Sequence, residues 1–309
     1  MNKPVKNYSR ICLIASACVL ALALVLSLCG LGVNYGIDFA GGWNLKYNMG
    51  ATFSQDDVSA AVSAQGVSGF KVSTTGAAGT ELQISIPQME AEKVEAIRAG
   101  FEQELLAKYP TMDVVDNSIS FVGPVAGRTL VQNAIVSVVL AALLMLVYIA
   151  IRFDIDSGIA AVFGLLHDVL MMLAFMVLLR NVIQMNSSFI AAMLTIVGYS
   201  INNTIVIFDR IRENNKKPGL GKLSREEVVG ISVRECLGRT INTTLTTLVT
   251  IVTLYILGVD SIREFTLPII VGIVSGVYSA NMINGYVWAF LEEKQKNHKQ
   301  AAKLKAKKA

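Results

Sequence analysis

Two adjacent polar residues interrupt a long apolar segment and could carry proton or ion chemistry. His167 and Asp168 lie in the apolar segment 158–179. They sit about ten residues from one end, which is near the middle of a bilayer at 1.5 Å per residue. A carboxylate there must be neutral, paired or beside water, because hydrocarbon does not solvate a charge. We favour a functional acid at Asp168, and His167 could instead be its structural hydrogen-bond partner.

A second polar cluster lies in VGYSINNTIVIFDRIREN, which begins at Val197 inside another apolar segment. Tyr199, Ser200 and Asn203 fall within one turn and one arc of a predicted helix, whereas Asn202 points to a different face. The two amides are therefore expected to make different contacts. Polar residues in a membrane helix usually face the protein interior, so this arc is a candidate ion-coupling site.

A third polar feature is a stripe headed by Arg239. Spacings of three and four residues place Arg239 on one helix face with four threonines: Thr243, Thr246, Thr250 and Thr253. Threonine hydroxyls also bond to their own helix, so the stripe can be merely structural. Its alignment with a cation favours a hydrated path.

These side chains need membrane helices to position them, and the composition is typical of such a protein. The chain has 309 residues, 53% of them hydrophobic and 16% charged, and its mean hydropathy is +0.53. That is too apolar for an ordinary soluble domain. Six apolar segments are predicted to span a membrane: 11–33, 131–151, 158–179, 188–208, 241–257 and 265–291. The first is too long for a cleaved signal peptide, so a retained anchor is favoured. In the last, Gly272 and Gly276 predict a close-packing face.

Basic residues predict the orientation of these helices. Lys and Arg follow the fourth and sixth segments in clusters, whereas only Arg180 and Arg263 occupy the short loops of the other side. Residues 1–33 should therefore comprise a cytoplasmic N-terminus and the first transmembrane helix, and the basic tail 292–309 should be cytoplasmic. Residues 34–128 should lie outside, and residues 129–291 should hold the other five helices. The tail could suggest nucleic-acid binding, but a role in topology and attraction to anionic membrane lipid is favoured.

The outer segment is predicted to be an α+β domain. WNLKYNM, FKVSTT, ELQISI and VVDNSISFV are expected strands, with a turn at GAAG and helices at 55–64 and 89–108. Ser54 with Asp57 resembles a capping box. The order βαβ-βαβ predicts a ferredoxin-like domain with both helices on one face of an antiparallel sheet. It has no His or Cys and no catalytic constellation, so we expect a binding or gating module and not an enzyme.

A glycine-rich motif, GIDFAGG, precedes this domain. Gly36, Gly41 and Gly42 suggest backbone turns that a side chain would block, and Asp38 is expected to cap a turn. Four cysteines, three of them in the first apolar segment, predict neither a disulfide framework nor a metal site. No cofactor is implied.

Together these motifs resemble the SecF family of bacterial protein-export subunits. The resemblance rests on GIDFAGG, FVGPVAG, HD at 167–168, VGYSINNTIVIFDRIREN with Asp209 and Arg210, and RT at 239–240. It covers nearly the whole chain, with the motifs in family order. It implies six transmembrane helices forming half of an RND-type transporter in the bacterial plasma membrane. The implied partners are a SecD-like subunit, the Sec translocon channel and unfolded secreted polypeptides, with export driven by the transmembrane proton gradient.

The resemblance also gives Asn203 a meaning. In the family that place is usually an aspartate, which is regarded as a proton carrier that works with the arginine matched by Arg239. Asn203 cannot ionise, although its amide both donates and accepts hydrogen bonds. The departure therefore questions proton coupling through this subunit.

Two other functions remain open at this point. One is a non-transporting membrane scaffold that holds the outer domain near the translocon. The other is an intramembrane aspartyl protease that uses Asp168 and Asp209. That chemistry needs two facing carboxylates at one depth, and Asp209 is expected at the cytoplasmic helix end beside Arg210 and Arg212, where an ion pair is favoured.

Overall fold

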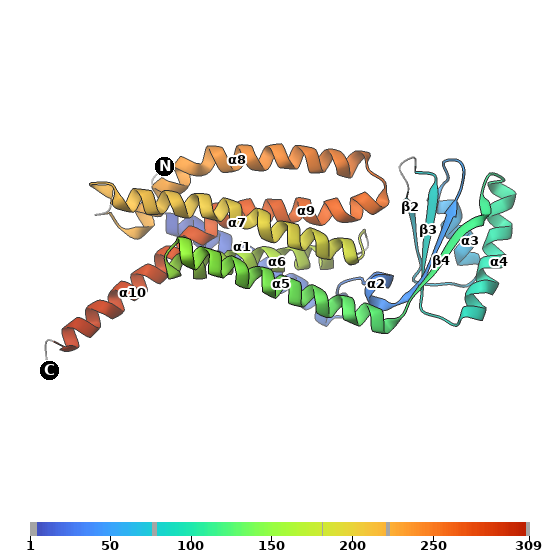
Figure 1. The fold of residues 1–309 in the computed structure, drawn as a ribbon, viewed down its shortest axis with the longest axis horizontal. Helices are drawn as coiled ribbons and strands as arrows, with labels where there is room; N and C mark the ends of the chain where they lie inside the picture. Colours follow the sequence, from blue (N-terminus) through green and yellow to red (C-terminus); the bar gives the residue numbers. More distant parts are fainter. Residues whose placement is uncertain (1–4, 76–78, 181, 221–222, 307–309) are drawn as a thin grey trace.

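The computed structural model describes residues 5–75, 79–180, 182–220 and 223–306, and shows a long helical bundle with an α+β domain at one end (Figure 1). Six helices in the described part are long and apolar enough to cross a membrane, which confirms the predicted number. The first five are α1 (Val5–Leu28), α5 (Pro124–Arg152), α6 (Ile155–Leu178), α7 (Ser187–Lys216) and α8 (Arg225–Leu257). The sixth runs through α9 (Asp260–Ser279), a π-helical turn (Ala280–Asn284) and α10 (Gly285–Ala306).

Local sequence signals set several helix starts. Pro124 begins α5, where the missing N–H of proline removes nothing that the helix needs. The Asn186 side chain accepts the Phe189 N–H at the start of α7, and Ser224 with Glu227 forms a complete capping box at the start of α8. Helix α8 therefore begins well ahead of the predicted membrane span 241–257.

Helix α9 lies at the centre of the bundle, where it packs against α6, α7 and α8. The predicted close-packing face is confirmed: a Cβ at Gly272 would strike the Ile196 side chain, and one at Gly276 would lie 3.1 Å from the Ser200 Cβ. The absent side chains let the polar stretch of α7 approach α9. Helices α1, α5 and α8 are peripheral, because little of their apolar surface is buried.

The domain between α1 and α5 has six elements in the predicted βαβ-βαβ order. They are β1 (Gly42–Asn48), α3 (Gln55–Ala64), β2 (Lys71–Thr75), β3 (Glu81–Pro87), α4 (Ala91–Lys108) and β4 (Asp113–Val122). The sheet is antiparallel, with strand order β2-β3-β1-β4. Most of the expected GAAG turn, residues 76–78, lies outside the described residues.

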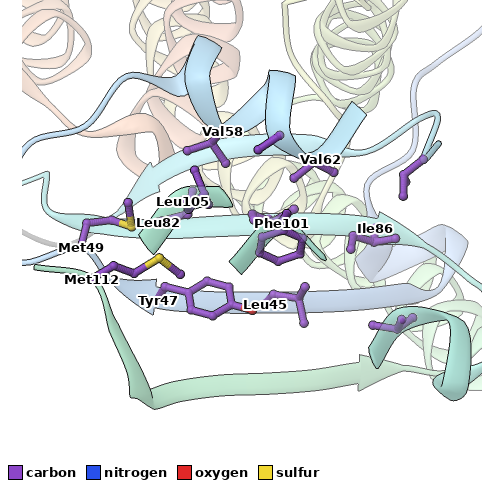
Figure 2. Close-up of a cluster of buried hydrophobic side chains, with 14 residues drawn as sticks. Leu45, Tyr47, Met49, Val58, Val62, Leu82, Ile86, Phe101, Leu105 and Met112 are labelled. Atoms are coloured by element: carbon purple, nitrogen blue, oxygen red, sulfur yellow. The ribbon is translucent and has the colours of Figure 1, made fainter. Parts of the chain in front are cut away.

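Both helices of this domain cover one face of the sheet. Figure 2 shows the shared core, in which Leu45 and Tyr47 of β1 meet Val58 of α3 and Phe101 of α4. These side chains are at most 1% exposed. Full burial of a large apolar side chain contributes about 1.5–3 kcal/mol, so this alternation of buried positions fixes the strand register.

The capping box predicted at Ser54 and Asp57 is wrong, although helix α3 begins there. The Ser54 side chain makes no capping hydrogen bond. The Asp57 carboxylate instead pairs with Lys108 Nζ at 2.6 Å and accepts the Tyr109 hydroxyl at 2.7 Å. These contacts from the end of α4 hold the pKa of Asp57 below its usual range. The Asp57 carboxylate therefore bonds to residues at the end of α4 and does not cap the N-terminus of its own helix, α3.

The GIDFAGG motif joins the α+β domain to α7. It contains the short helix α2 (Ile37–Ala40), and the Gly36 N–H donates to the Met185 carbonyl at 2.8 Å. The Asp38 carboxylate accepts the Ser187 N–H at 2.9 Å. Asp38 therefore caps α7 and not a turn of its own, because the N-terminal N–H groups of a helix lack partners within it.

Gly42 is expected to be the least replaceable residue of this motif. Its φ is +152°, and an added Cβ would clash with the Ile86 carbonyl and the Ile37 side chain. Gly42→Ala should lower the free energy of unfolding of the outer domain by about 2–3 kcal/mol, measured by thermal unfolding of the detergent-solubilised full chain. Gly66→Ala is the matched control: Gly66 has φ +74° but open space around it, so only about 1 kcal/mol of backbone strain is expected. Equal losses would show that the close approach at Gly42 is unimportant.

The α+β domain also contacts the start of α9. The Asp260 carboxylate accepts the Thr74 N–H at 2.7 Å and the Gln55 amide, and Glu264 pairs with Lys71. The carboxylates thus fix the end of β2 and the start of α3 to the central helix. Movement of this domain would act directly on α9.

Candidate functional site

Asp168 of α6 is a fully buried acid held by four side-chain contacts. It is 0% exposed. Its Oδ1 accepts the Ser275 hydroxyl at 2.8 Å and lies 3.0 Å from His167 Nδ1. Its Oδ2 accepts the Ser279 hydroxyl at 2.9 Å and the Ser200 hydroxyl. Helices α6, α7 and α9 therefore converge on one carboxylate, as expected for an acid inside a membrane bundle.

His167 connects this acid to α1. Its Nε2 lies 2.8 Å from the Ser16 hydroxyl, and Ser16 lies 3.3 Å from the Tyr278 hydroxyl. Tyr278 donates to the Cys12 carbonyl at 2.6 Å. The contacts form a continuous polar chain from Asp168 through His167, Ser16 and Tyr278 to the backbone of α1.

The chain fits two protonation states of the His167–Asp168 pair. When His167 carries both ring protons, Nδ1–H donates to Asp168 and Nε2–H to Ser16, whose own proton is free for Tyr278. When Nε2 is bare, it accepts the Ser16 proton, and the 3.3 Å contact with Tyr278 has no hydrogen to share. The two arrangements differ only in the direction of the Ser16 hydroxyl, because Tyr278 donates to the Cys12 carbonyl in both.

Two of the side chains that contact the pair, Ser16 and Ser275, also line a largely apolar cavity. A cavity of about 430 Å³ between α1, α6 and α9 is lined by Ser16, Ser275, Tyr278 and mostly apolar side chains such as Phe175 and Val274. Such a surface excludes water, which strengthens the electrostatic interaction of the acid with its donors.

The polar arc predicted on α7 contributes only in part to this site. Ser200 reaches Asp168, and Asn203, one turn further, is 2% exposed. The Asn203 Nδ2 has no hydrogen-bond partner among the described residues. Leaving a buried donor unpaired costs about 1–3 kcal/mol, so the Asn203 amide lowers the stability of the bundle at this position. Asn202 is exposed, which confirms that the two amides face different surroundings.

The stripe on α8 lies on a different surface. Arg239 and Thr243 are exposed, and the hydroxyls of Thr243, Thr246, Thr250 and Thr253 all donate to carbonyls of their own helix. These four threonines therefore show the structural alternative, in which each hydroxyl bonds to its own helix. Tyr199 reaches only as far as the Thr243 carbonyl, at 3.5 Å. In the described part of the chain, no hydrogen bond or ion pair joins Arg239 to Asn203 or to an acid.

The facing pair of carboxylates that an aspartyl protease needs is absent at Asp168 and Asp209 in the described part of the chain, as expected from the position of Asp209 at the helix end. Asp209 follows Ser200, which bonds to Asp168, by 209 − 200 = 9 residues, or about 14 Å along α7. Its nearest cation is Arg152, at 3.9 Å, and not Arg210 or Arg212. Arg210 pairs with Glu213 and Glu235 instead. No group of three metal-ligating side chains occurs among the residues that the structure describes.

Sequence reasoning placed Ser200 at the site but missed the roles of Ser16, Ser275, Ser279 and Tyr278 there. Ser275 and Ser279 stand four residues apart beside Gly276, so the close-packing motif already marked the helix face that meets Asp168. Nothing near Ser16 marked it, because a lone serine in an apolar helix also bonds to its own backbone.

Comparisons with a family model, with curated sequences and with solved structures all match this chain to SecD/SecF proteins. The family model described as "Protein export membrane protein SecD/SecF, C-terminal" matches residues 102–294. The SecF translocase subunit of Endomicrobium trichonymphae is 34% identical, over 80% of this chain and 78% of that protein. The SecDF subunit of Bacillus subtilis is 32% identical, over 83% of this chain but only 34% of that longer protein. The crystal structure of SecDF, described as a translocon-associated membrane protein, from Thermus thermophilus matches with a TM-score of 0.73 at 31% identity, over 92% of this chain and 38% of that one.

Proposed function

Because the chain belongs to the SecD/SecF protein-export family, we propose that it is the SecF-type accessory subunit of a bacterial protein translocase. It is a multi-pass membrane protein whose fold is that of a SecDF membrane half. The observation that carries the proposal is the combination of family identity with the buried Asp168 site. In this role the chain assists the Sec channel in moving unfolded secreted polypeptides outward.

A SecD-like subunit is the proposed partner. The chain spans 78% of a SecF relative but only 34–40% of fused SecDF proteins, which leaves room for a second half in another chain. Helix α8 supports this, because it presents the Arg239 cation on an exposed face. A charged side chain facing lipid near the middle of a helix costs about 2.5–3.5 kcal/mol, and a partner helix would remove that penalty.

A transmembrane ion gradient is the proposed energy source, with the His167–Asp168 pair as the proton-holding site of this subunit. The support is chemical: Asp168 is buried, bonded to side chains of α7 and α9, and connected through His167 to a polar chain that reaches α1. Asn203 has lost the ionisable group usual in the family and serves as a neutral neighbour. The alternative is a non-transporting scaffold, which the neutral Asn203 favours.

The orientation is also a proposal, with both termini cytoplasmic and residues 34–128, as a ferredoxin-like domain, outside the plasma membrane. In a variant without the four native cysteines, Ser63→Cys should react with an impermeant thiol reagent in intact cells, and Leu223→Cys should react only after lysis. Both side chains are exposed, so access depends on the side of the membrane. The reverse labelling pattern would contradict the proposed topology.

Gradient dependence separates the transporter from the scaffold. We expect Asn203→Asp to keep secretion within about twofold of wild type and to increase its dependence on the proton gradient, because it restores an ionisable group at a buried position one turn from Ser200. Secretion would be measured while the proton and sodium gradients are collapsed separately. Asn202→Asp, the same change on the exposed face, is the control and should bring no gain. Secretion that ignores both gradients in every variant would support the scaffold.

A further inference from the structure

A basic cavity lies at the end of the bundle opposite the outer domain (Figure 1), where α5 ends, α6 begins and α7 leaves the bundle. It has a volume of about 570 Å³, and its charged lining residues are Arg152, Asp209, Arg212, Glu213, Lys216 and Lys217. An adjoining cavity of about 310 Å³ shares Arg212 and Lys216 with it and adds the aromatic side chains Phe153, Phe208 and Trp288. Together the two cavities have a charged part, termed the mouth, and an adjoining part that includes three aromatic side chains.

The cations of this cavity are only partly neutralised. Glu213 is taken by Arg210 and Lys217, at 2.5 and 3.1 Å. Asp209 lies 3.9 Å from Arg152, the outer limit of an ion pair. Arg212 donates to the Arg152 carbonyl at 3.2 Å, and neither Arg212 nor Lys216 has an acidic partner among the described residues. Asp154 also lines the adjoining cavity, without pairing with either.

Arg212 is oriented in advance for an anion. One of its terminal nitrogens is held by the end of α5, which leaves other N–H groups of the planar guanidinium free for a phosphate. The Arg152 guanidinium lies over the Phe153 ring, 5.4 Å from its centroid, at the same rim. Two guanidinium groups from different helices, α5 and α7, thus line one anion-binding rim.

The flanks of the cavity identify the source of that phosphate. Ile151 and Ile155, directly before and after the turn between α5 and α6, are 83% and 72% exposed. Such side chains at the end of a membrane helix face acyl chains. A ligand that combines an anionic headgroup with acyl tails would fill the mouth and cover this apolar rim at once, whereas free phosphate would use only the mouth.

We infer that this cavity is a binding site for an anionic phospholipid, and that the lipid fastens the ends of α5, α6 and α7 to one another. Basic pockets between membrane helices bind anionic headgroups by the same physics, a local cation excess at the interface. The site is independent of the Asp168 chemistry and of the proposed export role.

The test uses the full chain in its purified membrane complex, in a mild nonionic detergent. Phosphatidylglycerol is added, and bound lipid is counted by native mass spectrometry beside the thermal unfolding midpoint. Arg212→Gln with Lys216→Gln should weaken phosphatidylglycerol binding about tenfold and abolish the rise in midpoint. Phosphatidylcholine and inorganic phosphate should give no rise in the unchanged protein.

The control removes two equally basic side chains from the tail, Lys294→Gln with Lys296→Gln, and should weaken binding less than about twofold. Equal weakening by both double variants would overturn the inference, since binding would then reflect general surface charge. A rise in midpoint with inorganic phosphate alone would overturn the lipid assignment. If the double variant fails to fold, Lys216→Gln alone decides: it breaks no hydrogen bond among the described residues, and it should weaken binding about threefold.

Discussion

Asp168→Asn is expected to reduce gradient-driven secretion at least tenfold while the protein stays folded. Asparagine keeps the shape of the side chain but replaces one accepting oxygen with a donor, and it never carries charge. In the wild-type protein both oxygens accept, from Ser200, Ser275, Ser279 and the His167 ring. The serine hydroxyls can rotate to accept from the new amide, so the loss of stability should stay near 1–2 kcal/mol.

The measurement is secretion from cells that carry each variant, with the proton gradient intact and then collapsed. Asp209→Asn is the matched control, because that side chain is 60% exposed and its nearest cation is 3.9 Å away, and secretion should not change. His167→Gln should fall between the two if the histidine shares the proton. Normal, fully gradient-dependent secretion from Asp168→Asn would show that this acid is not the carrier and that coupling resides in the SecD-like subunit.

The membrane part of the fold could be predicted because each span needs only a long apolar segment, a local property of the chain. The ends of the spans were less predictable. The fifth span was predicted only from residue 241, yet the capping box at Ser224 and the burial of Val228, Ser232 and Cys236 make α8 begin at Arg225. The π-helical turn at Ala280–Asn284 had no local signal, since it places Asn284 against Thr204 of α7 and so depends on a distant helix.

The sequence predicted only that part of the candidate site whose burial in an apolar helix is energetically unfavourable. A carboxylate in an apolar helix must be compensated, so Asp168 stood out alone. Its partners did not, because Ser16, Ser275 and Ser279 come from two other helices and become neighbours only in the folded bundle. The contacts of Asp38 and Asp57 show the same limit: each was assigned to a local turn or cap, and each instead binds a segment distant in sequence.

Arg239→Ala is expected to reduce recovery of the SecD-like partner about tenfold, and Arg239→Lys nearly as much. The guanidinium is exposed on α8 and cannot lose its proton in the bilayer, so it requires an acceptor from outside the described chain. A carboxylate of the partner would accept two parallel hydrogen bonds from the planar group. Lysine keeps the charge but loses that geometry, and leaving the partner's acid incompletely paired costs about 2–5 kcal/mol.

The measurement is co-purification of the partner from native membranes in a mild detergent, followed by secretion in cells with each variant. Thr250→Ala is the control on the same face: its hydroxyl donates at 3.2 Å to the Thr246 carbonyl of its own helix, so recovery should not change. Wild-type recovery and secretion with lysine would show that charge alone suffices at this position. Reduced partner recovery with Thr250→Ala as well would indicate that packing of the whole α8 face, and not a specific ion pair, holds the partner. The Thr250 hydroxyl already bonds to its own helix, so its side chain can contribute to the interface only through packing.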